Sequence, residues 1–257
     1  MNIPKLTYKE NTPHPSLNDY IKSYWQFTIR TNSPASFDIL PDGYFDLMVI
    51  VRNNDIKSVK ITGIWSKSVQ IEYVNDTDVI GIRFKPSALD NLLKCNLNKL
   101  LNSSESVDLK EFGLCKQRFI DYFNTTEKKL INYLDECFMQ RINDSIVNQR
   151  LISFFNIIQQ SSGIISVKYL ANKLNISPRQ LQRYAYSNLG IGTKEYINII
   201  KLKNTLWQLK TDKTDIYPYN DQSHFIKEVK KHTGYTPNKI DLNNDVRFLQ
   251  YYDFTNS

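Results

Sequence analysis

Two short helices around a sharp turn are the feature that most restricts the fold of this chain. Ser166 suits a helix cap, and a helical apolar pattern follows it at Val167, Leu170, Ala171 and Leu174. Asn175 tolerates the left-handed conformation that a sharp turn needs. A second helix starts at Ser177, where a serine cap, a proline at the first helical position and Gln180 at the third coincide. Gly190 is a suitable residue to end it.

The second helix has two different faces. Its predicted buried stripe is Leu181, Tyr184, Ala185 and Leu189, and its predicted exposed stripe is Arg179, Gln182, Arg183 and Tyr186. Arginine can bond to guanine O6 and N7, and glutamine to adenine N6 and N7, which is the chemistry of a recognition helix in the major groove. The pattern therefore favours a DNA-binding helix-turn-helix. An ordinary amphipathic helix with a solvated face is the alternative.

Positive charge is concentrated in the same part of the chain. The 257 residues carry a formal net charge of +7, from 33 Lys plus Arg and 26 Asp plus Glu. Residues 166–240 hold 13 of the basic and 5 of the acidic side chains, a balance of +8, and the remainder has a balance of −1. Such a basic segment beside a neutral remainder is typical of a module that binds phosphates, although a solvated lysine-rich surface would give the same count.

The composition excludes several classes of protein. A hydrophobic fraction of 41% indicates a folded globular chain of one or two domains. Cys95, Cys115 and Cys137 are odd in number and widely spaced, which argues against a disulfide framework and a structural zinc site and favours the cytoplasm. Neither a signal peptide nor an apolar run of about 20 residues is present, so we expect no membrane segment.

The region before the helix-turn-helix is predicted to change from strands to helices. Short runs rich in Val, Ile, Tyr and Phe, separated by turn residues, predict strands at 24–29, 45–51, 69–73 and 79–84. Helical spacing of leucines follows between 89 and 101, and further helices are predicted at 127–138 and 145–160. The Ser161-Ser162-Gly163 segment is the best linker candidate.

Two C-terminal motifs identify a family resemblance. Asp221-Gln222-Ser223-His224-Phe225, followed by Lys230-Lys231-His232-Thr233-Gly234-Tyr235-Thr236-Pro237, resembles the signature of the AraC family of bacterial transcription regulators. Residues 167–190 are similar to that family's first helix-turn-helix. The resemblance implies two helix-turn-helix units joined by a long helix, here Thr193 to Lys210, about 27 Å long at ~1.5 Å per residue. Two recognition helices so joined would enter successive major-groove segments about 34 Å apart.

The resemblance also assigns site residues. Base contacts are implied for Arg179, Gln182 and Arg183 in the first unit, with Tyr186 on the same stripe, and for Gln222, Ser223 and Lys227 in the second. Phosphate contacts are expected from Lys194, Lys201, Lys203, Lys230 and Lys231. No metal is expected, because His224 has no carboxylate or thiol at ligand spacing.

The second unit departs from the family pattern. Where the family has the first helix of that unit, this chain has only Thr211 to Asp221, so about one and a half turns are missing. Thr214, Asp215 and Ile216 match the start of that helix, and Pro218 disfavours a helix there. We expect a truncated second unit in which the first unit keeps the main base-contacting role.

The N-terminal part resembles an uncharacterised domain that often precedes AraC-type DNA-binding domains. The resembling residues are Leu17, Tyr20-Ile21, Ser23-Tyr24-Trp25, Ile39-Leu40-Pro41-Asp42-Gly43, Asp46-Leu47 and Gly81-Ile82-Arg83-Phe84-Lys85-Pro86. Such domains generally sense a small molecule, dimerise or do both. The candidate effector-binding residues are Trp25, Asp42, Tyr44, Asp46, Trp65, Arg83 and Lys85. A hairpin turn at Asp42-Gly43 and core tryptophans are the alternative explanation.

These observations predict an α+β protein with four parts. They are a β-rich sensor or dimerisation domain (1–86), a helical connector packed with it (87–160), an AraC-type all-α DNA-binding domain (161–245) and a C-terminal tail (246–257). We expect a cytoplasmic, sequence-specific transcriptional regulator of double-stranded DNA. A small-molecule effector, a homodimer and RNA polymerase are candidate partners, and no membrane partner is expected.

Other classes of function remain as alternatives. No catalytic motif or Gly-rich phosphate loop is evident, and with only three histidines there is no convincing acid/base constellation, so neither an enzyme nor a cofactor is expected. The main alternative is a ligand-binding or protein-interaction module whose AraC-like domain has lost specific DNA binding. A nonspecific DNA binder without an effector is a third interpretation.

Overall fold

An antiparallel β-sheet fills the N-terminal part of the computed structural model, which describes residues 5–31, 33–73, 76–89, 92–93, 97–143, 149–211, 217–219, 221–241 and 248. The strands are β1 (Lys5–Asn11), β2 (Ile21–Arg30), β3 (Ala35–Ile39), β4 (Phe45–Arg52), β5 (Asp55–Thr62), β6 (Val69–Tyr73), β7 (Thr77–Phe84) and β8 (Ser104–Ser106). Six of these described strands pair in the order β1-β2-β7-β4-β5-β8, and β3 pairs with β6 in a separate two-stranded sheet. The four strands predicted from the sequence are confirmed within a residue or two, except that β2 begins three residues earlier.

The two faces of the large sheet bury different clusters, because successive side chains of a strand point to opposite faces. Tyr24, Leu47 and Ile82 pack on one face against the helices that follow the strands. Trp25 and Phe27 belong to a second cluster, which also contains Phe37 of β3 and Tyr73 of β6. The small sheet therefore covers the second face, and the strands form a sandwich.

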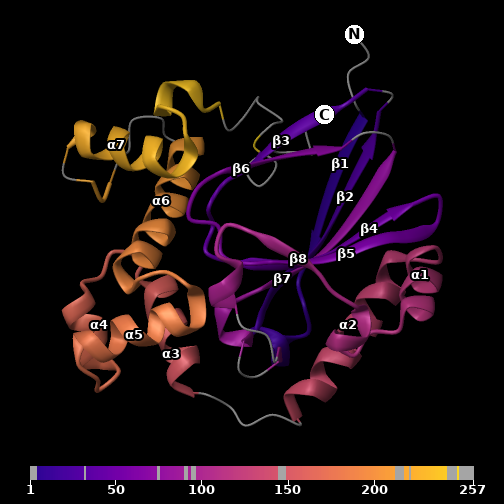
Figure 1. Ribbon diagram of the computed structural model, residues 1–257, viewed down its shortest axis with the longest axis horizontal. Helices are drawn as coiled ribbons and strands as arrows, with labels where there is room; N and C mark the ends of the chain where they lie inside the picture. Colours follow the sequence, from indigo (N-terminus) through magenta and orange to yellow (C-terminus); the bar gives the residue numbers. More distant parts are fainter. Residues whose placement is uncertain are drawn as a thin grey trace.

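Helices make up the rest of the described chain (Figure 1). They are α1 (Lys116–Phe123), α2 (Glu127–Asn143), α3 (Gln149–Gln160), α4 (Val167–Lys173), α5 (Pro178–Leu189), α6 (Thr193–Thr211) and α7 (Gln222–Thr233). Short 3₁₀ helices lie at Pro15–Leu17, Pro86–Ala88, Leu97–Leu100, Leu109–Phe112 and Pro237–Lys239. The described leucines between 89 and 101 thus lie in or beside 3₁₀ turns, so the helical spacing there does not produce one continuous α-helix.

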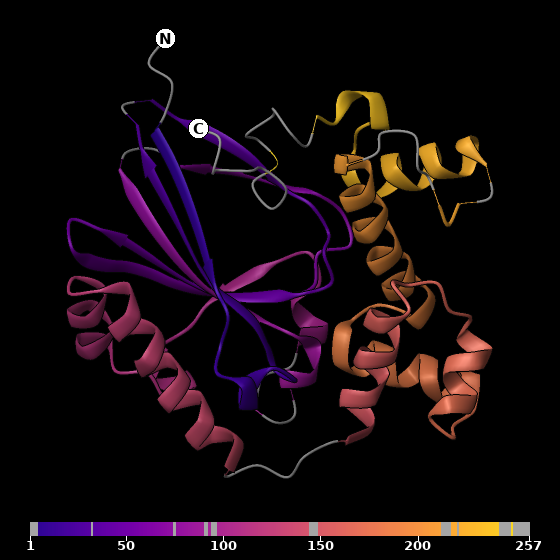
Figure 2. The ribbon, with the colours of Figure 1, turned by 180° about the vertical axis from the view of Figure 1, so that it is seen from behind.

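The helices form two groups that lie apart in both views (Figures 1 and 2). Helices α1 and α2 form one group, in which Phe138 of α2 packs edge to face on Phe84 of β7 with ring centroids 5.5 Å apart. Helices α3 to α7 form the other. In it α6 runs beside the strands with α4 and α5 near one end and α7 near the other. The predicted α+β class is confirmed.

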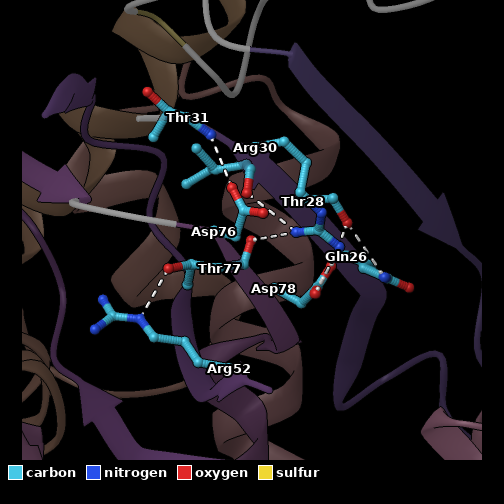
Figure 3. Close-up of polar contacts among 9 residues, drawn as sticks. Gln26, Thr28, Arg30, Thr31, Arg52, Asp76, Thr77 and Asp78 are labelled. Carbon is cyan, nitrogen blue, oxygen red and sulfur yellow. Dashed lines mark hydrogen bonds and ion pairs between the residues drawn. The ribbon is translucent and has the colours of Figure 1, made fainter. Parts of the chain in front are cut away.

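A polar network fixes the ends of β2 and β7 (Figure 3). Arg30 Nη2 lies 2.9 Å from Asp78 Oδ2, and Thr28 Oγ1 donates to Asp78 Oδ1 over 2.6 Å. Beside them the backbone N–H of Thr31 donates to Asp76 Oδ1 at 3.0 Å, and Arg52 Nε donates to Thr77 Oγ1 at 2.9 Å. These bonds hold together the adjacent ends of β2, β7 and β4, so the network has a structural role.

Helix α3 packs with the C-terminal helices. The rings of Phe154 and Phe155 lie 6.3 and 5.4 Å from the ring of Tyr196 on α6, and Phe154 also contacts Tyr184 on α5. Residues of α3 thus form part of the core beneath α5 and α6, although the sequence placed them in the connector. No described helix is both long and apolar enough to cross a lipid bilayer.

Candidate DNA-binding surface and effector pocket

The predicted second helix of the first unit is α5, and the predicted signals define both its ends. Ser177 and Gln180 form a reciprocal capping box: Gln180 N donates to Ser177 Oγ at 3.2 Å, and Ser177 N donates to Gln180 Oε1 at 2.8 Å. Gly190 ends the helix with a φ of 74°, a left-handed conformation that favours glycine. Asn175, at φ 52°, makes the turn that precedes α5. These capping contacts fix where α5 begins and ends.

The outer face of α5 presents three of the four predicted side chains to solvent. Arg179 and Arg183 are exposed, and Tyr186 is 51% exposed. Gln182 differs, because its Oε1 accepts the backbone N–H of Thr193 at 3.1 Å. This bond ties α5 to the first residue of α6, so Gln182 has a structural role that competes with the predicted base contact.

Helix α7 presents the predicted residues of the second unit. Asp221 caps it, with its Oδ1 accepting the backbone N–H of His224 at 2.7 Å. Gln222, Ser223 and Lys227 are exposed, as are Lys230 and Lys231. The opposite face buries Phe225 and Val229 against Leu202 and Leu206 of α6.

The predicted loss of a helix before α7 falls mainly outside the described residues, which omit 212–216 and 220. The described residues 217–219 form a turn and not a helix. Tyr219 in this turn is buried, and its ring lies 5.3 Å from that of Phe225. This contact provides part of the support that a preceding helix would give.

Two of the five lysines predicted to contact phosphate are held in contacts within the chain. Lys203 Nζ lies 4.3 Å from the ring centroid of Tyr44 and donates to its hydroxyl at 3.1 Å. Lys201 Nζ lies 4.1 Å above the ring of Tyr219. Burial lowers the pKa of both ammonium groups. Lys201 and Lys203 are only partly exposed and engaged with aromatic rings, whereas Lys194 is exposed, so in this conformation these two lysines are less available to phosphate than Lys194.

Lys203 belongs to a wider contact between the strands and α6. On α6, Tyr196 is fully buried and donates its hydroxyl proton to the backbone carbonyl of Gly43 at 3.1 Å. Tyr196 and Ile200 lie in the same continuous core cluster as Phe45 and Leu47 of the sheet. The helix joining the two units is therefore part of the core, not a solvated linker.

The end of α7 is bonded to the segment between β5 and β6. Ser68 N donates to His232 O at 2.7 Å, and Ser68 Oγ donates to Thr233 O at 2.8 Å. His232 is fully buried, with its Nδ1 2.6 Å from Ser66 O. Just beyond the helix, Tyr235 donates to Asp38 Oδ2 of β3 at 2.9 Å. Residues of the motif at 230–237 thus also make contacts within the chain.

A small pocket of about 80 Å³, partly open to solvent, lies between the two sheets. Five aromatic and four aliphatic side chains line it, together with three polar ones. They are Tyr8, Trp25, Phe27, Trp65 and Tyr73, then Ile39, Met48, Val69 and Ile71, then Asp46, Thr62 and Arg83. The pocket is therefore apolar over most of its wall, as small-molecule sites are.

The strand register gathers the polar side chains of the pocket. Asp46 of β4 pairs directly with Arg83 of β7, and Arg83 Nε lies 3.2 Å from Asp46 Oδ1. The same oxygen accepts Trp25 Nε1 at 2.7 Å, and Asp46 N donates to Thr62 Oγ1 at 2.8 Å. Asp42 Oδ2 lies 3.8 Å from Arg83 Nε. Two carboxylates thus face one guanidinium.

Burial and the neighbouring charges shift the pKa values of Asp46 and Arg83 in opposite directions. Burial raises the pKa of the Asp46 carboxyl, although Arg83 and two hydrogen bonds oppose the rise. For Arg83, burial acts to lower the pKa, but the charges of Asp46 and Asp42 outweigh it and raise the pKa above its ordinary value. The guanidinium is consequently a permanent charge in this part of the pocket.

The structure brings together four of the seven predicted effector residues: Trp25, Asp46, Trp65 and Arg83. The other three lie elsewhere. Asp42 pairs with Arg83 but does not line the pocket. Tyr44 accepts a hydrogen bond from Lys203 of α6, and Lys85 Nζ donates to the carbonyl of Asn18. This corrects the predicted pocket wall, in which Tyr44 was included.

Eight lining residues were missed by the sequence prediction: Tyr8, Phe27, Ile39, Met48, Thr62, Val69, Ile71 and Tyr73. The available signal was alternation, since Trp25 and Phe27, Asp46 and Met48, and the three residues of β6 are each two apart and so share a face. Among the described residues, no group of three or more His, Cys, Asp or Glu side chains is placed to hold a metal ion.

Comparison with known proteins gives two family matches and several structural ones. Residues 170–241 match a model described as a helix-turn-helix domain, and residues 9–106 match a domain of unknown function, DUF6597. No match was found among curated proteins.

The similar solved structures include ToxT from Vibrio cholerae. One structure has 11% identity, covers 91% of this chain and 96% of that one, and gives a TM-score of 0.44. A structure of wild-type ToxT bound to an unsaturated fatty acid has 13% identity, coverages of 92% and 95%, and a TM-score of 0.43. The family matches therefore place a helix-turn-helix domain at residues 170–241 behind a DUF6597 domain at residues 9–106, which is the order of domains that the sequence motifs predict.

Proposed function

We propose that the protein is a sequence-specific DNA-binding transcriptional regulator that contacts the major groove mainly through α5. The observation that carries this proposal is the exposed row of Arg179, Arg183 and Tyr186 on a helix whose opposite face is buried in the helix-turn-helix. Arginine side chains in such a row can bond bidentately to guanine edges. Helix α7, with Gln222, Ser223 and Lys227 exposed, is the proposed second and weaker contact.

Phosphate contacts in this proposal come from the exposed lysines. Lys194, Lys230 and Lys231 are exposed on the two helix-turn-helix units, and the segment from 166 to 240 carries a balance of +8. If about five phosphates are neutralised, the logarithm of affinity falls with the logarithm of salt concentration with a slope near −4 to −5. The proposal includes a cytoplasmic location and no enzymatic activity.

The pocket is the proposed effector site, and two chain segments connect it to α7. Strand β3 contributes Ile39 to the pocket and Asp38 to the bond with Tyr235. Residues 65–69 likewise contribute Trp65 and Val69 to the pocket and Ser68 to the bonds with the end of α7. A ligand that shifts either segment would change how α7 is held. A homodimer, contact with RNA polymerase and domain limits at residues 86, 160 and 245 complete the proposal.

Binding of labelled duplex DNA at several salt concentrations tests the DNA-binding function. Fluorescence anisotropy with a pool of random duplexes measures the salt slope of the wild type. The Arg179→Ala/Arg183→Ala double variant is then compared with Arg118→Ala/Lys110→Ala, which removes two exposed charges from the other side of the molecule. We expect weaker binding for the first variant alone. Equal binding by both variants would contradict the role of α5.

A second candidate function is a ligand-binding or protein-interaction module that no longer binds specific DNA. The internal contacts of Gln182, Lys201 and Lys203 favour it, because three predicted DNA contacts are used within the chain. An affinity for DNA that does not change with salt would support this candidate and contradict the regulator.

A further inference from the structure

The polar side chains of the pocket sit together in a wall that is otherwise apolar. The ring of Trp25 packs closely over Gly81 of β7, where a Cβ would lie only 1.9 Å from the ring. Arg83 lies over the same ring, with its Cζ 5.9 Å from the ring centroid, and Tyr8 stacks on it at 6.4 Å with an interplanar angle of 25°. The stacked rings of Trp25 and Tyr8 therefore lie beside the carboxylate of Asp46. A flat, mainly apolar ligand would cover the greatest area of this wall.

The hydrogen bonds among Trp25, Asp46 and Arg83 use only one of the two carboxylate oxygens of Asp46. Asp46 Oδ1 accepts from both Trp25 Nε1 and Arg83 Nε. Within the described part of the chain, no hydrogen bond reaches Asp46 Oδ2 or the terminal nitrogens of Arg83. An ionised carboxylate accepts through both oxygens, and a guanidinium has five N–H donors. The pair therefore offers an acceptor beside donors, on side chains that are only 14% and 13% exposed.

Charge restricts what can bind to this pair. A carboxylate ligand could bond to Arg83, but it would meet the two carboxylates of Asp46 and Asp42, which already share that guanidinium. An ammonium ligand could bond to Asp46 but would meet the permanent charge of Arg83. In a largely buried site such like-charge contacts are strongly unfavourable. An uncharged group that both accepts and donates hydrogen bonds can bond to Arg83 and Asp46 without any like-charge contact.

We propose that the pocket binds a flat, uncharged, largely apolar molecule with an amide-like edge, whose carbonyl accepts from Arg83 and whose N–H donates to Asp46. Trp25, Trp65 and Tyr8 contact its ring, and Thr62 lies beside the polar edge. The assignment as an effector rests on the proposed regulatory function, whereas the ligand class rests on the pocket alone.

Three probes that share one ring and differ in charge test this ligand class. Indole-3-acetamide is neutral with an amide, indole-3-acetate is an anion, and tryptamine is a cation. Isothermal titration of the full chain with each, at pH 7 without DNA, should rank the acetamide first by at least about tenfold, as expected for two hydrogen bonds to charged partners. Tighter binding of the acetate or of tryptamine, or no binding of any probe, would overturn the proposal.

The Asp46→Asn variant tests the charge argument directly. It keeps the size of the side chain and removes one negative charge beside Arg83, so the preference should shift from the acetamide toward the acetate. Asp78→Asn is the matched control, since Asp78 also pairs with an arginine on the same sheet but does not line the pocket. An unchanged ranking in a folded Asp46→Asn protein would overturn the proposal. If that variant does not fold, the wild-type ranking still decides.

The ligand class and the regulatory function fail in different experiments. Isothermal titration follows binding of each probe, because the indole probes fluoresce in the same range as tryptophan, and anisotropy of labelled duplex DNA measures the DNA affinity with and without each probe. Binding of the acetamide with no change in DNA affinity would contradict the effector role and leave the ligand class intact. If the protein binds DNA but none of the probes binds to it, the ligand class is wrong and the DNA-binding function is not affected.

Discussion

Replacing Tyr196 with Phe tests whether α6 is bonded to the strands as part of one core. The tyrosine is fully buried, its ring contacts Phe154 and Phe155, and its hydroxyl donates to the carbonyl of Gly43. Phenylalanine keeps the ring and removes the donor from a buried acceptor. A lost hydrogen bond of this kind costs about 1–3 kcal/mol. A loss of about 2 kcal/mol corresponds to a fall in Tm of about 4–8 °C for a chain of this size.

Differential scanning calorimetry measures this effect on the full chain. We expect one main transition, because the buried cluster continues from the sheet into α4, α5 and α6, and a lower Tm for Tyr196→Phe. Tyr169→Phe is the control: Tyr169 is 53% exposed, and surface changes usually stay within about 0.5 kcal/mol. A fall of less than about 1 °C for Tyr196→Phe, or equal falls for both variants, would refute the argument.

Three further predictions concern local features. Ser177→Ala removes the cap of α5 and should lower the free energy of unfolding by about 1 kcal/mol in urea titrations; an unchanged midpoint would contradict the capping role. Lys203→Met should leave the salt slope of DNA binding unchanged, since Nζ is bonded to Tyr44, whereas loss of a phosphate contact would reduce the slope by about one. Burial raises the pKa of Tyr44 and of Tyr73 to about 12, so the folded chain keeps these protons to higher pH than the unfolded chain. Stability is then complete below pH 10 and falls as the pH rises toward about 12; urea midpoints that are constant over this range would contradict the prediction.

Local chemistry made the helix-turn-helix predictable from sequence. The cap at Ser177 and the glycines at 190 and 234 define helix ends through bonds between residues only a few positions apart. Such signals do not depend on the rest of the fold, so α5 has the predicted bounds. The strands at 45–52 and 77–84 were similarly visible as runs of β-favouring residues.

Long-range packing explains what the sequence did not predict. Lys203 and Tyr44 are 159 positions apart, and nothing in the local pattern around either residue indicates their bond. The same holds for Gln182, whose partner Thr193 lies beyond the end of the helix. Four of the twelve residues that line the pocket were predicted, because Asp46 and Arg83 are charged residues in apolar strands, whereas the aliphatic wall resembles any strand core.

Selection of random duplex DNA by the purified full chain tests whether α5 gives sequence-specific DNA binding. It is run at near-physiological salt, beside the Arg179→Ala/Arg183→Ala variant and with the Arg118→Ala/Lys110→Ala variant as control. We expect an enriched sequence motif for the wild type and the control, and its loss when the two arginines of α5 are removed. No enrichment by the wild type, or the same motif from all three proteins, would contradict sequence-specific binding through α5.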